Sequence, residues 1–283
     1  MEPTPHSINM RFAPAGTFDL DTLADLFTRS FAEYFYPVNL SAENLAQQMR
    51  VESIDLWHSL VMLVDEQPVG IALLARRGER VWCGGFGITL PWRGYGLAQP
   101  LAEAMIDQAR QTGARTLTLE VLTRNKRAIR LYTRAGLHIT RDLLIVEWRR
   151  PKDGLPSKPN VSLIATNADE LLEHFGLLHP VAAAWQRELT TLILRGGLLG
   201  AALRMNEDTA AYVLYQKGSN GGLRLADLGA QDATQAKLLL AALQLHSKHL
   251  VSVNEPANSP LTTAFIAAGF VEIDRQHEMT IKL

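Results

Sequence analysis

The first half of the chain alternates between the two-residue period of strands and the period of about 3.6 residues that is typical of helices. Two apolar runs, 59–64 and 69–75, are separated by a polar turn at 65–68 and predict a hairpin. Gly136 directly follows the helical pattern 125–135, at the position where glycine commonly ends a helix. The other predicted elements are a strand at 8–12, a helix at 23–34, a strand at 81–90, a helix ending near 111, and strands at 116–121 and 144–148. This order predicts an α/β fold with a mixed, mostly antiparallel central sheet flanked by helices.

The second half repeats this order of elements. Strands are predicted at 200–205, 209–216 and 223–228, followed by a helix at 235–247, a strand at 250–253, a helix at 259–268 and two short final strands. Arg134-Ala135-Gly136-Leu137 and Ala267-Ala268-Gly269-Phe270 are related by an offset of 133, which also places the strand 116–121 on 249–254. The pattern favours two tandem copies of one fold. The alternative is coincidence, because the order of strand and helix involved is common.

A polar segment with three prolines separates the two halves. Proline fixes φ and donates no backbone hydrogen bond, so the segment is expected to enter neither a helix nor a sheet. The predicted organisation is a first domain at 1–149, a linker at 150–160 and a second domain at 161–283.

The composition excludes several classes of protein. Of 283 residues, 47% are hydrophobic and 20% are charged, which excludes collagen-like and disordered chains. The net charge of -1 gives no overall attraction to nucleic acid or to an anionic membrane. The single cysteine, Cys83, provides neither a disulfide framework nor a structural zinc site. No membrane-spanning or signal-peptide pattern is found, so a cytoplasmic location is expected.

A short glycine-containing turn follows the strand predicted at 81–90. It reads Arg93-Gly94-Tyr95-Gly96-Leu97-Ala98, and a helix begins there. Such a turn directs several backbone N–H groups into one space, next to the positive end of a helix, and so forms a site for phosphate or pyrophosphate. It is neither a P-loop nor a dinucleotide-binding fingerprint. The alternative is simply a tight connection between a strand and a helix.

A second motif lies 32 residues after Arg93, and the pair resembles a known family. Asn125, Ala128, Leu131, Tyr132 and Gly136 fit the pattern Asn-x-x-Ala-x-x-Leu-Tyr-x-x-x-Gly-Leu/Phe. With the turn at 93–98, this resembles the GNAT superfamily of acyl-CoA-dependent N-acetyltransferases. The resemblance covers residues 7–149, and the second half resembles a degenerate copy of the same fold.

The resemblance implies how acetyl-CoA would be held. Backbone amides of the turn would bind the pyrophosphate, with Arg93 at the head of the turn; the amides belong to Gly94, Tyr95, Gly96, Leu97 and Ala98. Phe86, Gly87 and Ile88 would form the strand edge that pairs with the pantetheine arm. Asn125 would contact the cofactor from the start of the next helix, and it also fits the role of a helix cap.

Two residues are candidates for catalysis. Tyr132 occupies the position where many family members keep a tyrosine near the thioester sulfur, and its hydroxyl would donate a hydrogen bond to the developing thiolate. Glu120 is the candidate base, because an alkylamine with a pKa near 10 is only about one part in a thousand neutral at pH 7. The alternative for Tyr132 is an aromatic residue that only packs in the core. The alternative for Glu120 is a glutamate at the strand edge that pairs with a nearby arginine. Cys83 is expected to be a buried spectator.

The second half lacks most of this set. At the offset of 133, Tyr132 corresponds to Phe265, Glu120 to Val253 and Arg93 to Ala226. Only the first domain is therefore expected to bind acetyl-CoA.

The function implied by the resemblance is transfer of an acetyl group from acetyl-CoA to an amine, by direct attack in a ternary complex and without a metal. The acceptor, a small-molecule or peptide amine, would enter near Tyr34, Tyr36 and Glu120. The rival hypotheses are a non-catalytic acyl-CoA sensor and an interaction module that binds no cofactor. No nucleic-acid or membrane partner is expected, and a homodimer is compatible with the sequence.

Overall fold

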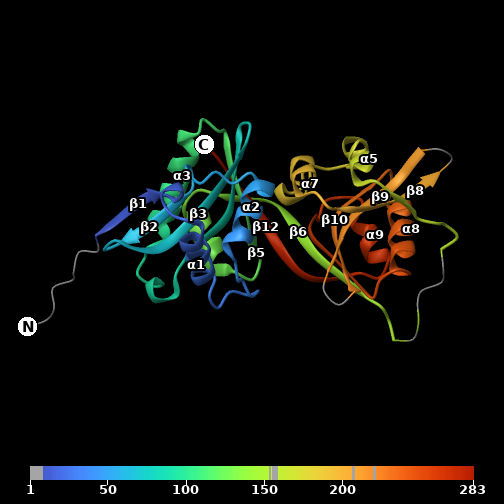
Figure 1. The fold of residues 1–283 in the computed structure, drawn as a ribbon, viewed down its shortest axis with the longest axis horizontal. Coiled ribbons are helices and arrows are strands. Elements are labelled where there is room, and N and C mark those ends of the chain that lie inside the picture. The colour runs from blue at the N-terminus through green and yellow to red at the C-terminus, as the bar shows by residue number, and fades with distance from the viewer. Residues whose placement is uncertain (1–8, 153, 155–158, 206–207, 219–220) are drawn as a thin grey trace, which may run out of the picture. The chain divides into compact units, whose positions relative to one another are not determined.

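The computed structural model describes residues 9–152, 154, 159–205, 208–218 and 221–283. Ile8 of the first predicted strand, and residues 153 and 155–158 of the predicted linker, lie outside the described residues. The chain forms two compact units (Figure 1). The first unit runs to Ile139 and includes Met279–Leu283, whereas the second unit is Thr140–Glu278. These limits differ from those expected from the sequence, because each unit contains a strand segment from the other half of the chain.

The first unit is a mixed sheet with the strand order β1-β2-β3-β4-β5-β12. Neighbouring strands from β1 to β4 are antiparallel, and β4 and β5 are parallel. The strands are β1 (Met10–Pro14), β2 (Leu60–Val64), β3 (Gln67–Arg77), β4 (Arg80–Ile88), β5 (Thr116–Leu122) and the end of β12 (Val271–Lys282). The helices are α1 (Leu20–Ser30), α2 (Ala42–Glu52), α3 (Ala98–Gln111) and α4 (Lys126–Arg134), with short 3-10 turns η1 (Ala15–Thr17) and η2 (Leu90–Trp92). The predicted fold class is confirmed.

The two faces of this sheet are covered by different helices. Leu101 and Met105 of α3 and Leu131 of α4 share one fully buried core with alternate residues of β2 to β5. On the opposite face, α1 lies directly on β4 where the strand carries glycine. A Cβ atom at Gly85 would stand 2.3 Å from the Phe27 ring, and one at Gly87 would stand 2.9 Å from the Ser30 carbonyl oxygen. The glycines of β4 therefore allow the close approach of a helix.

The parallel strands β4 and β5 separate part way along their length. Their pairing extends from Arg80 and Thr116 to Cys83 and Leu119, although both strands continue beyond these residues. The separation begins at Gly84, where β4 carries a bulge against β3. Bulges increase local twist and redirect a strand. We call the point where β4 and β5 stop pairing the fork of the first unit.

The second unit repeats the arrangement in the strand order β12-β6-β11-β10-β9-β8-β7. The strands are β6 (His138–Arg149), β7 (Ile164–Thr166), β8 (Leu199–Met205), β9 (Asp208–Lys217), β10 (Leu223–Ala230), β11 (His249–Pro256) and most of β12. The helices are α5 (Ala168–Leu172), α6 (Phe175–Leu178), α7 (Leu189–Arg195), α8 (Ala233–Gln244) and α9 (Thr262–Ala267), with a 3-10 turn η3 (Trp185–Arg187). A single long strand, β12, replaces the two short final strands that were predicted.

The second unit has a fork of its own. Parallel pairing of β10 with β11 ends at Leu225 and Ser252, and β10 bulges at Ala226 against β9. Ala226 thus corresponds to Gly84, and its predicted correspondence with Arg93 is wrong. The offset of 133 holds for β5 and β11, but it fails for β4 and β10 because the connection to the next helix differs in length. Residues 89–97 connect β4 to α3, whereas only residues 231–232 connect β10 to α8.

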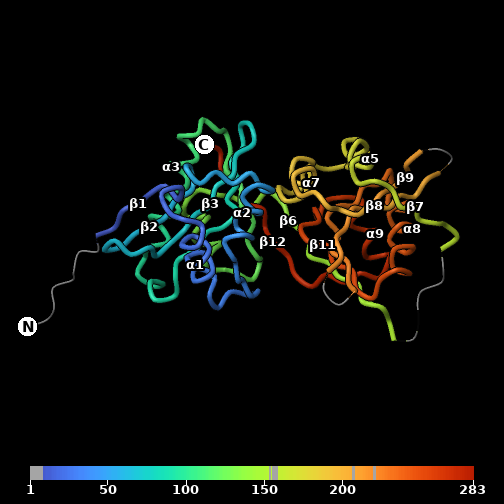
Figure 2. The backbone as a smooth tube through the Cα atoms, in the orientation of Figure 1, coloured from blue at the N-terminus to red at the C-terminus, as the bar shows by residue number. Residues whose placement is uncertain are grey.

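The last five residues of the chain belong to the first unit. Met279 is fully buried in the core of that unit, and Ile281 packs against the same core. The backbone N–H of Leu283 donates to the carbonyl of Arg115 at 2.9 Å. Figure 2 shows the red C-terminal trace ending among the elements of the first unit. Within the described residues, no helix is long and apolar enough to cross a membrane.

Candidate active site

The turn between β4 and α3 offers free backbone N–H groups. Gly94 and Gly96 have φ values of +91° and +80°, and no atom lies within 4 Å of the Cβ position of either residue. Among the hydrogen bonds of the described residues, none uses the backbone N–H of residues 94–98 as a donor. A row of free N–H groups at the start of the 14-residue helix α3 suits an anion such as a diphosphate.

The side chain of Arg93 holds this turn in place. Its guanidinium donates to the carbonyl of Ile88 at 3.0 Å, at the end of β4. It also donates to the carbonyls of Ser30 at 3.0 Å and Ala32 at 2.9 Å, where α1 ends. The guanidinium thus joins the turn to the helix on the other side of β4. The sequence motif gives no indication of these three acceptors, and the predicted role of Arg93 in binding a cofactor stays a prediction.

The edge of β4 beyond the fork consists of Phe86, Gly87 and Ile88. These residues pair with β3 on one side, at Ala72, Ile71 and Gly70. On their other side, β4 has left β5. Phe86 is half-buried, and its ring meets the Tyr132 ring edge-on with the centroids 5.6 Å apart. An extended amide-containing molecule could pair with such an edge as an added strand does.

Glu120 lies on β5 just beyond the fork, on the face that α1 covers. Its neighbours in sequence, Leu119 and Val121, point into the core on the opposite face. The carboxylate oxygen Oε2 of Glu120 accepts a hydrogen bond of 2.7 Å from the indole Nε1–H of Trp82. A half-buried carboxylate with a fixed donor is thus positioned where the two strands separate.

Tyr132 reaches the same region from the opposite face. It is 6% exposed and belongs to the core that α3 and α4 form. Burial is the main cause that raises the pKa of Tyr132 well above its ordinary value, with smaller contributions from Cys83 and Tyr34. The hydroxyl therefore stays protonated and suits a hydrogen-bond donor.

The Cys83 thiol is buried in the same core as Tyr132. Burial, chiefly, and the charge of Glu120 raise the pKa of Cys83 to about 12, while a backbone hydrogen bond at Gly85 acts in the opposite direction. A thiol with this pKa is almost wholly protonated at neutral pH and is a poor nucleophile. The electrostatic contacts also show that Glu120 and Tyr132 both lie near Cys83, although they come from opposite faces of the sheet.

Asn125 caps α4. Its side-chain oxygen accepts a hydrogen bond of 3.1 Å from the backbone N–H of Ala128, which satisfies one of the free donors at the start of the helix. The predicted cap is therefore present. Its predicted contact with a cofactor remains a prediction.

Aromatic residues follow α1 near the start of α4. Tyr34 packs edge-on against Phe31 and Phe35. The guanidinium of Arg124 lies over the rings of Phe35, at 4.6 Å, and Tyr36, at 5.3 Å. Phe35 and Tyr36 are both partly exposed, at 44% and 40%. Sequence reasoning placed the acceptor near these tyrosines but missed Arg124, which directly precedes the motif, and also missed Trp82.

The corresponding region of the second unit differs in two ways. First, α8 begins with Asp232, whose carboxylate accepts the backbone N–H of Gln235 at 2.9 Å. This carboxylate occupies the helix end where an anion would bind and would repel a diphosphate. Secondly, no glycine turn precedes α8, because only residues 231–232 follow β10.

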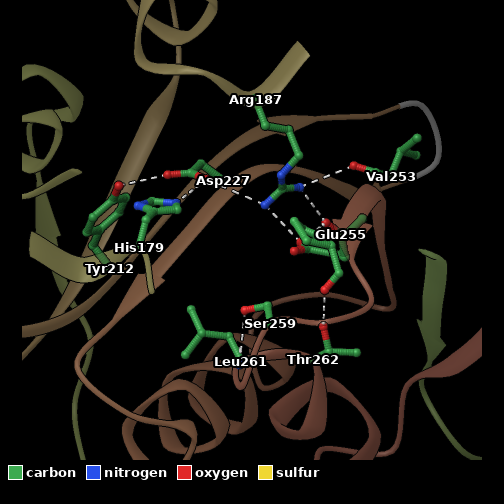
Figure 3. A network of polar contacts seen from close by, with 11 residues as sticks. His179, Arg187, Tyr212, Asp227, Val253, Glu255, Ser259, Leu261 and Thr262 are labelled. Carbon is green, nitrogen blue, oxygen red and sulfur yellow. Dashed lines mark hydrogen bonds and ion pairs between the residues drawn. The ribbon is translucent and has the colours of Figure 1, made fainter. Parts of the chain in front are cut away.

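A buried network of charged side chains occupies the fork of the second unit (Figure 3). Arg187 donates to Ser252 Oγ at 2.9 Å and to the carbonyl of Val253 at 3.3 Å, both on β11. It also forms ion pairs with Glu255 on β11, at 2.8 Å, and with Asp227 on β10, at 3.5 Å. The Arg187 side chain, which is 6% exposed, thus bridges the two strands where their pairing ends.

Two further side chains, Tyr212 and His179, contact Asp227 and extend this network. The hydroxyl of Tyr212 donates at 2.7 Å and His179 Nε2 lies at 3.0 Å. His179 Nδ1 lies 2.8 Å from the carbonyl of Phe175. Since a backbone carbonyl and a carboxylate only accept, both bonds form together only when His179 is the doubly protonated imidazolium. Within the described residues, no three His, Cys, Asp or Glu side chains lie close enough to hold a metal ion.

Comparison with known proteins agrees with this geometry. Residues 20–137, which make up most of the first unit, match the profile of the Acetyltransferase (GNAT) family. The chain resembles a tandem GNAT protein from the clavulanic acid biosynthesis pathway, with a TM-score of 0.71 and 17% identity, over 97% of this chain and 98% of that one. It also resembles a GCN5-related N-acetyltransferase from Sphaerobacter thermophilus, with a TM-score of 0.68 and 15% identity, over 99% and 97% of the two chains. At these identities the likeness concerns the fold, which is a tandem GNAT fold. No curated protein matches the sequence.

Proposed function

We propose that the first unit is an N-acetyltransferase, which moves an acetyl group from acetyl-CoA to a small-molecule or peptide amine by direct attack in a ternary complex. The observation that carries this proposal is the fork between β4 and β5. Beyond the fork, β4 leads into the turn that carries the free N–H groups of residues 94–98. Glu120 approaches the fork from one face of the sheet and Tyr132 from the other.

The residues of the first unit fit acetyl-CoA. The open space at Gly94 and Gly96 leaves the turn accessible to a diphosphate, whose charge the free N–H groups would stabilise. The edge at residues 86–88 offers backbone groups to the amides of the pantetheine arm. When bound, acetyl-CoA supplies an activated acetyl thioester.

Glu120 and Tyr132 perform complementary tasks in this proposal. Glu120 accepts, directly or through a water molecule, the proton that the amine loses as its nitrogen bonds to the acetyl carbon. The Tyr132 hydroxyl donates a hydrogen bond to the sulfur, which leaves as the carbon–sulfur bond breaks and finally takes up a proton. The raised pKa of Tyr132 favours a hydrogen bond over complete transfer of its own proton.

Two measurements test the proposal. Calorimetry with acetyl-CoA should give one binding site per chain, because the second unit lacks the turn and carries Asp232 in its place. Release of free CoA thiol across a panel of amines should then identify an acceptor. Absence of acetyl-CoA binding would refute the proposal and would favour an interaction module. Binding without turnover on any amine would favour the alternative of a non-catalytic acyl-CoA sensor.

Substitution of Tyr132 by phenylalanine separates the roles of the ring and the hydroxyl. The ring contact with Phe86 is retained, so acetyl-CoA affinity should stay within about twofold. The loss of one hydrogen bond to a developing charge should lower kcat by about tenfold to a hundredfold. Unchanged kcat in the Tyr132→Phe variant would remove the hydroxyl from the mechanism.

A further inference from the structure

We propose that Trp82 is a positioning residue for the proposed base, and that its indole N–H fixes the Glu120 carboxylate at the fork. The inference rests on the proposed function. The bond from Trp82 Nε1 to Glu120 Oε2 measures 2.7 Å, which is short for an N–H donor and typical of a charged acceptor. Trp82 is 3% exposed, so the donor is held by the packing around the indole and cannot be replaced readily by water.

The strand register explains why these two side chains meet. Trp82 on β4 pairs with Thr118 on β5, and Glu120 is the next residue on the same face of β5. Both belong to the face that α1 covers. The indole lies where pairing is still intact, one residue before it ends at Cys83. The donor is therefore anchored in the closed part of the sheet, whereas the acceptor lies just beyond the fork.

Gly84 makes room for this arrangement. A Cβ atom at Gly84 would stand 2.4 Å from the Trp82 ring, a distance that real Cβ atoms do not tolerate. The bulge at Gly84 thus has two effects. It separates β4 from β5, and its missing side chain lets the indole lie across the strand toward Glu120. The same residue that opens the sheet positions the donor for the carboxylate next to the opening.

The indole N–H stabilises the ionised carboxylate and restricts its orientation. Removal of the donor should therefore slow the proton-accepting step without weakening acetyl-CoA binding. In the Trp82→Phe variant we expect kcat to fall by about tenfold, with KM for acetyl-CoA unchanged. We also expect the acid limb of the pH–rate profile to move to higher pH, because protonation of the carboxylate is no longer opposed by the donor.

A double-mutant cycle distinguishes this role from a structural one. Glu120→Gln removes the base but retains an oxygen that can accept from the indole. Trp82→Phe should cause little further loss of kcat in that background. Gly84→Ala should reproduce the effect of Trp82→Phe by displacing the ring. Trp148→Phe, which alters an equally buried tryptophan in the second unit, serves as the matched control and should leave kcat and the pH profile unchanged.

One readout is independent of turnover. The indole N–H resonance of Trp82, assigned by its absence in Trp82→Phe, should shift with pH and should change in Glu120→Gln. If turnover is found and Trp82→Phe behaves like Trp148→Phe, the positioning role is wrong while the proposed function stands. If no amine is acetylated but the resonance responds to Glu120, the contact stands and the proposed function fails. A resonance that is insensitive to Glu120→Gln would overturn the positioning role in either case.

Discussion

The network in the fork of the second unit makes its stability depend on pH. Burial alone would lower the pKa of His179, but the charge and the hydrogen bond of Asp227 outweigh burial and raise it above its ordinary value. Burial would raise the pKa of Asp227, but His179, Arg187 and Tyr212 together hold it below its usual range. His179 and Asp227 thus each stabilise the charged form of the other.

The sign of the effect follows from these directions. A histidine with a raised folded-state pKa contributes its full stabilisation below about pH 6.5, the value of the unfolded chain, and loses it as pH rises through the folded-state pKa. Asp227, with a lowered pKa, contributes above about pH 4 and loses its stabilisation at lower pH. The pair therefore stabilises the second unit fully between about pH 4 and 6.5.

The magnitude follows from the contacts that are lost. Deprotonation of His179 removes its charge and one of its two hydrogen bonds, at about 1.5–3 kcal/mol. We expect the free energy of unfolding to fall by this amount as pH rises above 6.5. Replacement by glutamine should remove this pH dependence and should destabilise the unit at pH 6 by about 3 kcal/mol, since Asp227 is fully buried.

Urea denaturation at a series of pH values, followed by circular dichroism, measures the effect. His246→Gln is the matched control, because His246 is an exposed histidine of the same unit. If wild type and His179→Gln lose stability in parallel between pH 6.5 and 8.5, the network does not contain a titrating imidazolium and the reasoning is refuted.

Two further substitutions test the packing of the first unit. Gly87→Ala should destabilise it by about 1–3 kcal/mol in urea melts, because the added methyl group meets the backbone of α1. Gly176→Ala, where the methyl group meets open space, should stay within about 0.5 kcal/mol. Met279→Ala should lower stability by about 2–5 kcal/mol, and acetyl-CoA should restore part of the loss if the first unit binds it. Met205→Ala, at a position 52% exposed, should be nearly neutral, and equal losses in the two methionine variants would contradict the assignment of the last five residues to the first unit.

Local signals allowed much of the first unit to be predicted. The strand that became β5, the helix that became α4 and its cap at Asn125 follow from short-range periodicity and capping chemistry. Gly136 ends that helix with φ of +100°, as expected of glycine at this position. The turn at Gly94 and Gly96 could likewise be predicted, since φ values of +91° and +80° strongly favour glycine.

Contacts between distant residues were not predictable in this way. Gly85 and Gly87 of β4 face Phe27 and Ser30, more than 50 residues earlier, and nothing near them in the sequence indicates a helix on that face. The acceptors of Arg93 are backbone carbonyls, which every residue type carries, so the sequence does not indicate where they lie. The network around Asp227 was missed because its members are far apart in the sequence and lie on separate elements, so no local pattern brings them together.

The place of Met279–Leu283 in the first unit has a consequence for synthesis of the protein. Domains usually fold in order as the ribosome delivers them, starting from the N-terminus. Here the segment that contributes Met279 to the first core is translated only after the whole second unit, Thr140–Glu278. The first unit therefore stays incompletely packed until the whole of the second unit has been synthesised. Removal of Met279–Leu283 would leave the first unit with apolar core surface exposed where Met279 packs, and chaperones and proteases recognise such surfaces.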